Sequence, residues 1–139
     1  MRDFHHMSQK GFTLLELVSV IIILGVISAI AVPRYYDYKT QAELTMIKST
    51  LANVRSAINN FYLNKALTED EPRYPTLAEL TTPGTVIKET MPDNPKNGGN
   101  NIIGEGVAPR QLKHPNTYGW GYRSDSGTFW ANTEDLNNL

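Results

Sequence analysis

The chain has 139 residues, the length expected of one small domain with an attached anchor. It contains no cysteine, which excludes disulfides, thiolate metal sites and cysteine nucleophiles. The formal net charge is -1, so a general nucleic-acid binder is not expected. A small domain without disulfides depends on its core, on oligomerisation or on a bound ion.

Residues 12–32 form an apolar run whose single charged member is Glu16. At about 1.5 Å per residue, a helix of this length spans the roughly 30 Å hydrocarbon core of a bilayer. The preceding segment carries Arg2 and Lys10 against Asp3. This small excess of positive charge favours a cytoplasmic N-terminus, with the bulk of the chain across the membrane.

Two simpler interpretations of the apolar run are a cleaved signal peptide and a plain membrane anchor. The small residues at 29–31 are typical of a signal-peptidase site, but the run is longer than the usual 7–15 residues of a signal peptide. Neither interpretation explains Glu16, because a carboxylate within a spanning helix costs roughly 2.5–3.5 kcal/mol and usually marks function.

Cleavage between Gly11 and Phe12 would provide a partner for this carboxylate. It creates an α-amino group four residues before Glu16. In a bundle of such helices, the amine of one subunit and the carboxylate of a neighbour can neutralise each other. Removal of either partner from such a pair should be strongly destabilising.

The segment KGFTLLEL, residues 10–17, resembles the class III signal of type IV pilins and type II secretion pseudopilins. The resemblance covers about the first quarter of the chain. It implies that prepilin peptidase cuts after Gly11, that the new N-terminal Phe12 is methylated, and that Glu16 directs subunit addition. Gly25 and Pro33 occupy family-typical positions and are weak points of the helix, since both lower helix stability.

The same resemblance implies partners and a location. The partners are copies of the chain and other pilins or pseudopilins, prepilin peptidase, the inner-membrane assembly platform with its ATPase, and membrane lipid before assembly. The precursor is expected to cross the inner membrane once, with a cytoplasmic N-terminus and a periplasmic C-terminal domain. It would then enter a periplasmic or extracellular filament.

Beyond the anchor, an apolar stripe predicts that the helix continues to about residue 64. The stripe recurs at spacings of three and four, with polar residues on the opposite face. Its members are Leu44, Ile47, Leu51, Val54, Ile58 and Phe61. The expected organisation is a leader at 1–11, an anchor helix at 12–33, an amphipathic continuation at 34–66 and a small domain at 67–139.

The rest of the chain predicts a short helical turn and antiparallel strands. Residues 77–80 favour the turn, 85–89 a strand, and 118–123 with 128–132 a hairpin. In the hairpin, Tyr118, Trp120 and Tyr122 alternate with other residues, so they are expected on one strand face that covers the helix. The fold class is therefore α+β, a long helix packed on a small antiparallel sheet, as in pilins.

The C-terminal half also resembles the pseudopilins, less specifically, at RYPT (residues 73–76) and MPDNP (residues 91–95). Major pseudopilins continue into an acidic calcium-binding loop, whereas only Glu134 and Asp135 follow the last strand here. Asp93, Asn94 and Asn97 offer oxygen ligands for calcium, but residues of these types in a loop rich in proline and glycine also form turns. No other cofactor is expected.

No catalytic set emerges, because His114 is the one histidine outside the leader and no phosphate-binding glycine motif is present. The chain is expected to be the substrate of an enzyme and not an enzyme itself. The favoured function is a filament subunit, and within that class a pseudopilin of a type II secretion system is favoured. The alternatives are a type IV pilin of a surface pilus and a non-polymerising, membrane-tethered binding module that uses the aromatic face of residues 118–122.

Overall fold

The computed structural model describes residues 11–69, 72–104 and 117–133. Most of the expected leader, His114, and the acidic residues Glu134 and Asp135 lie outside the described residues. The chain divides into two units, Met1–Thr40 and Gln41–Leu139. Each unit is described by itself below.

Helix α1, Leu14–Thr68, contributes to both units. It is the one described helix that is long and apolar enough to cross a membrane, and no residue of its most apolar window is buried within the chain. The helix begins two residues after the expected start at Phe12 and continues to Thr68, where Lys65 and Glu69 form an ion pair in its last turn. Residues 72–75 after it are not helical, as the prolines there predict.

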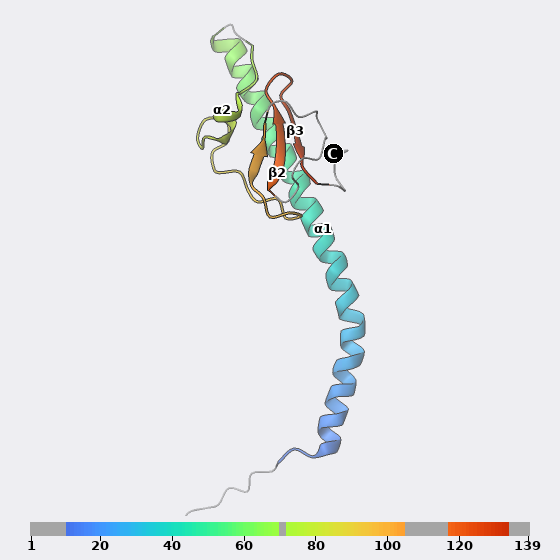
Figure 1. Cartoon of the computed structure of the whole chain (residues 1–139). Coiled ribbons are helices and arrows are strands. Elements are labelled where there is room, and N and C mark those ends of the chain that lie inside the picture. The colour runs from blue at the N-terminus through green and yellow to red at the C-terminus, as the bar shows by residue number, and fades with distance from the viewer. Residues whose placement is uncertain (1–10, 70–71, 105–116, 134–139) are drawn as a thin grey trace, which may run out of the picture. The chain divides into compact units, whose positions relative to one another are not determined.

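In the second unit, α1 lies beside a small sheet (Figure 1). The predicted stripe of α1 and residues of this sheet share one core. Ile47, Leu51, Val54 and Ile58 are buried there, and Leu44 is partly buried. The short helix α2, Leu77–Thr81, adds Leu80 to the same core. The predicted α+β class and the predicted turn at residues 77–80 are both confirmed.

The sheet has three strands in the order β1-β2-β3. β2 (Tyr118–Arg123) and β3 (Thr128–Ala131) form the predicted antiparallel hairpin, with Trp120 opposite Ala131 and Tyr122 opposite Phe129. β1 (Asn101–Ile103) pairs with β2 in parallel. The sheet is therefore mixed, whereas the sequence predicts antiparallel strands throughout.

The predicted strand at residues 85–89 is wrong. This segment is a turn followed by bends, closed by the N–H of Gly84, which donates to the carbonyl of Ile87 at 2.7 Å. Gly84 has a φ of +85°, a conformation that glycine adopts at little cost. Val86 and Ile87 are apolar because they pack on the edge of the core, partly buried, without belonging to the sheet.

Two of the three alternating aromatics face α1, and the third does not. Trp120 and Tyr122 belong to the core shared with the helix, while Tyr118 packs against Ile103 and Trp130 in a second, smaller cluster. The register between β1 and β2 shifts at this point: Asn101 lies opposite Tyr118, and Ile102 lies opposite Trp120. One extra residue, Gly119, therefore interrupts the alternation and separates Tyr118 from the other two.

Candidate processing and assembly site

The predicted cleavage bond lies before the first helical turn. Gly11 and Phe12 precede α1, and the Phe12 side chain is 84% exposed within the chain. A Cβ added to Gly11 would meet no atom within 4 Å. The bond between these residues is thus outside regular secondary structure, which is the condition a peptidase needs to bind an extended backbone.

Thr13 and Glu16 form a reciprocal cap at the start of α1. The Thr13 N–H donates to Glu16 Oε2 at 2.8 Å, and the Thr13 hydroxyl donates to the same oxygen at 2.8 Å. In return, the Glu16 N–H donates to the Thr13 hydroxyl oxygen at 3.2 Å. This is the geometry of a capping box, in which a Thr and the Glu three residues later satisfy backbone N–H groups at a helix start.

The capping role of Glu16 is additional to its predicted role between subunits. A Thr followed three residues later by Glu, directly before an apolar run, is the sequence signal of such a box, and it could have located the start of α1. No ion pair joins Glu16 to a cation among the described residues. Its charge therefore has hydrogen-bond donors from Thr13, but no counter-ion in the part of the chain that the structure describes.

A second capping box, at α2, shows what a counter-ion adds. Thr76 and Glu79 repeat the arrangement of Thr13 and Glu16. Here Arg73 also donates from Nη1 to Oε2 and from Nη2 to Oε1 of Glu79, both at 2.8 Å. The hydrogen bonds from Arg73, then that from the Thr76 backbone, lower the pKa of Glu79 from 4.5 to about 2.

The two predicted weak points of the helix lie inside α1. The helix continues through Pro33, which lacks an N–H and cannot form the usual bond to the preceding turn. A Cβ on Gly25 would meet no atom within 4 Å, so no contact with the described residues requires a glycine there. Their role as weak points of the helix stays a prediction.

The three calcium candidates belong to a loop with a structural role. Asp93 is exposed, whereas Asn94 is fully buried and its side-chain N–H donates to the Gly119 carbonyl at 2.7 Å. The side-chain oxygen of Asn94 accepts the Lys96 N–H, and that of Asn97 accepts the Gly99 N–H. Both oxygens therefore close turns in the loop. In the part of the chain that the structure describes, no group of three or more His, Cys, Asp or Glu residues could hold a metal.

This loop touches β2 very closely. The Asn94 N–H donates to the Gly99 carbonyl at 2.8 Å, and a Cβ added to Gly119 would lie 1.8 Å from that same carbonyl oxygen. Asn97 also donates from its side chain to the carbonyls of Tyr118 and Asn132. These bonds fix the loop to the start of β2 and to Asn132, the residue directly after β3.

The predicted aromatic platform is not available at the surface. Trp120 is fully buried and stacks on Phe129 with the ring centroids 5.7 Å apart. Tyr122 is also buried, and its hydroxyl donates to the Pro75 carbonyl at 2.6 Å. Burial is the main cause that raises the pKa of this hydroxyl. Both rings hold the domain together, as the core interpretation of the hairpin predicts.

Comparison with known proteins finds a family model and several relatives that match part of the chain. A family model described as the prokaryotic N-terminal methylation motif matches residues 6–32. The type IV major pilin protein PilE of Neisseria gonorrhoeae is 33% identical over 87 residues, which are 62% of this chain and 52% of the relative. A type IV narrow pilus major component of Thermus thermophilus is 53% identical over 51 residues, covering 37% of this chain and 44% of the relative.

A third relative, the type IV major alpha-pilin of Moraxella bovis, is 44% identical over 52 residues, or 37% of this chain and 33% of the relative. The chain spans about half the length of the first of these relatives. No solved structure matches it significantly. The fold and the N-terminal site define a protein whose first helix is capped at its start and begins with an apolar stretch of bilayer length, followed by a small α+β domain. The N-terminal methylation motif and the similarity to type IV pilins together support a type IV pilin-like protein.

Proposed function

We propose that this chain is a structural subunit of a type IV pilus-like filament, made as a membrane-anchored precursor and cut between Gly11 and Phe12. The observation that carries the proposal is Glu16, a carboxylate within an apolar helix that lacks a counter-ion among the described residues. Cleavage after Gly11 supplies a cation, the new Phe12 amine, which methylation leaves charged.

Assembly follows from the two partners that Glu16 can have. Before assembly, Thr13 donates two hydrogen bonds to the carboxylate and so lowers the cost of keeping it in the membrane. In the filament, the Phe12 amine of a neighbouring subunit pairs with it and fixes the register of the added subunit. An unpaired charge in such surroundings is costly, so subunits in the wrong register are disfavoured.

The first candidate for the filament is a surface type IV pilus. It is supported by the relatives, which are described as major pilins or as a major pilus component. The second candidate is the filament of a type II secretion system. It is supported by the RYPT segment at residues 73–76, which resembles pseudopilins. This segment is held to α2 by the Arg73–Glu79 pair and to β2 by the bond from the Tyr122 hydroxyl to the Pro75 carbonyl.

In either system the chain works with the same partners. Prepilin peptidase cuts and methylates the precursor, and an inner-membrane platform with its ATPase adds subunits, with the N-terminus on the cytoplasmic side. Because the ATPase supplies the energy, the subunit itself needs no nucleotide site and no catalytic residues. The small domain lies in the periplasm until the filament extends.

The central test separates cleavage from assembly. In Glu16→Ala, we expect normal cleavage at Gly11 but no filaments, and in Gly11→Val we expect the longer precursor to accumulate in the membrane. Mass spectrometry reads the N-terminus, and electron microscopy or a secretion assay reads the filament. Glu89→Ala, at an exposed residue far along the chain, is the control and should leave both unchanged.

Two results would contradict parts of the proposal. Normal filaments from Glu16→Ala would show that the carboxylate does not pair between subunits. A mature N-terminus at Val32 would favour a signal peptide. A binding module without polymerisation predicts full function of Glu16→Ala. Such a module needs an aromatic platform at the surface, and the burial of Trp120 and Tyr122 argues against one.

A further inference from the structure

A band of aromatic and charged residues follows the apolar stretch of α1 within the first unit. The sequence immediately after Pro33 is RYYDYK, residues 34–39. Its three tyrosines, Tyr35, Tyr36 and Tyr38, are 66%, 63% and 62% exposed, so no other described part of the chain covers them. Because successive helical residues point about 100° apart, these rings project from different sides of the helix.

The composition of this band fits the boundary between lipid and water. Tyrosine is enriched at that boundary since its ring is apolar and its hydroxyl binds water or headgroups. Arg34 and Lys39 flank the rings and carry long side chains that reach headgroup phosphates. If these residues only contacted a protein on one side of the helix, the tyrosine rings on the other sides would have no partner.

We propose that residues 34–39 are a lipid headgroup belt that sets the depth of the anchor, and that this depth places Glu16 at the opposite edge of the hydrocarbon core. The inference rests on the proposed membrane anchor. Tyr35 follows Glu16 by 19 positions, which is about 28 Å along a helix with a rise of 1.5 Å per residue. The hydrocarbon core is roughly 30 Å thick, so the two residues lie close to its two boundaries.

This depth changes the energetic account of the carboxylate. At the centre of a bilayer an acidic side chain is costly, but near a boundary it can reach water or headgroups. The Thr13 donors then cap the helix at the boundary, and the bond from Gly11 to Phe12 lies outside the hydrocarbon. Both the cleavage bond and the assembly carboxylate would thus be reachable from one membrane surface.

The chain offers a simple way to measure depth, because it has no cysteine of its own. Single cysteines placed at positions 15, 18, 21, 30, 34 and 40 of the full chain can be tested in sealed vesicles of phosphatidylethanolamine and phosphatidylglycerol. A water-soluble maleimide, added to one or both sides, reports which positions are protected. We expect protection at 18, 21 and 30, and labelling at 15, 34 and 40.

Two triple variants test whether the tyrosines set this pattern. Tyr35→Leu, Tyr36→Leu and Tyr38→Leu together extend the apolar surface, so the helix should slide and the boundary near residue 16 should move by about two to four residues toward the C-terminus, up to one turn. The matched control replaces the same three tyrosines by Trp, which also prefers the boundary. It should leave the pattern unchanged.

The outcomes separate this inference from the proposed function. An unchanged boundary in the Leu variant, with the expected protection of the single-cysteine proteins that keep the native tyrosines, would overturn the belt and leave the anchor intact. Labelling of every introduced cysteine in the proteins that keep the native tyrosines would overturn the membrane anchor itself. A boundary that moves in the Leu variant and not in the Trp variant supports the belt.

Discussion

Arg73 and Glu79 form an ion pair with two parallel hydrogen bonds, both 2.8 Å long, across the start of α2. The guanidinium of Arg73 also lies 5.2 Å from the ring centroid of Phe61 on α1. One side chain therefore contacts the helix that precedes it and the helix that follows it. Since the Glu79 carboxylate also caps α2 with Thr76, its charge matters for the order of this whole connection.

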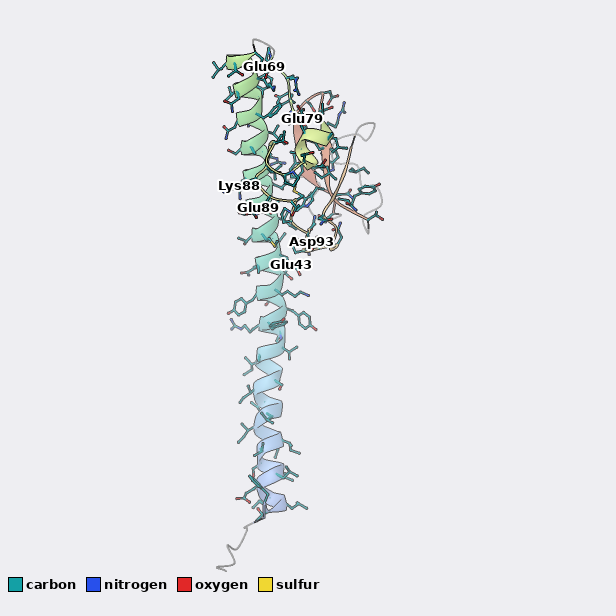
Figure 2. All side chains as sticks on the ribbon, turned by 90° about the vertical axis from the view of Figure 1, so that its left-hand side faces the viewer. Glu43, Glu69, Glu79, Lys88, Glu89 and Asp93 are labelled. Atoms are coloured by element: carbon teal, nitrogen blue, oxygen red, sulfur yellow. The ribbon has the colours of Figure 1, made fainter. Side chains whose placement is uncertain are left out.

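The first prediction is that stability depends on the charge of Glu79, whose side chain is labelled in Figure 2. Its pKa falls from 4.5 to about 2 on folding, so folding favours the charged form. The stabilisation is complete above about pH 4.5 and is lost as the pH falls toward 2. Glu79→Gln should therefore cost about 1 kcal/mol at pH 7 in the detergent-solubilised chain, and the difference from wild type should shrink at low pH.

The control for this experiment is Glu89→Gln. Glu89 is exposed and forms no ion pair or hydrogen bond with another described residue (Figure 2). Thermal unfolding followed by circular dichroism at pH 7, 4 and 2.5 gives the comparison. A Glu79→Gln variant that loses as much stability at pH 2.5 as at pH 7 would rule out the charge as the cause.

The second prediction concerns two glycines with positive φ. Gly84 and Gly127 have φ values of +85° and +64°, so a side chain at either position strains the backbone by about 1–2 kcal/mol. A Cβ at Gly84 would meet no atom within 4 Å, whereas one at Gly127 would lie 2.4 Å from the ring of Tyr74. Gly127→Ala should therefore be more destabilising than Gly84→Ala.

Denaturant unfolding of the two variants measures this difference, because the backbone strain is common to both. Tyr74→Leu in the Gly127→Ala background should recover part of the additional loss. Equal losses in the two single variants would show that the Tyr74 ring moves aside without cost.

The third prediction tests the packing of α1 on the sheet. Ile47 is fully buried, and its neighbour Met46 is 45% exposed. Ile47→Ala leaves a cavity in the core and should cost about 2–5 kcal/mol, whereas Met46→Ala should change stability by less than about 0.5 kcal/mol. Both substitutions keep good helix formers in place, so helix propensity does not explain a difference. Similar losses in the two variants would contradict the observed face of the helix.

The long helix and the hairpin could be predicted because their patterns repeat. The stripe from Leu44 to Phe61 has six members at helical spacing, and only one face of α1 accounts for it. The hairpin has alternating aromatics and a turn that ends in Gly127. In both cases several residues report the same period, and the structure confirms the elements they predict.

The missed features depend on contacts with few local signals. β1 has three residues and pairs in parallel with a strand that begins 15 residues later. It therefore has no adjacent hairpin turn from which it could be predicted. The change of face at Tyr118 comes from one extra residue in the register with β1 and not from the strand's own sequence. The Thr13–Glu16 cap does have a local signal, because Thr and Glu three residues apart directly precede the apolar run.

The contact between Gly99 and Gly119 constrains how this sequence can change over generations. The carbonyl of Gly99 occupies the space that a Cβ at Gly119 would need, and a Cβ at Gly99 would lie 2.9 Å from the Gly119 N–H nitrogen. A side chain at either position therefore clashes with the backbone of the other glycine. The two positions should be inherited as a pair, and lineages that lose one glycine should also carry a rebuilt loop between residues 94 and 99.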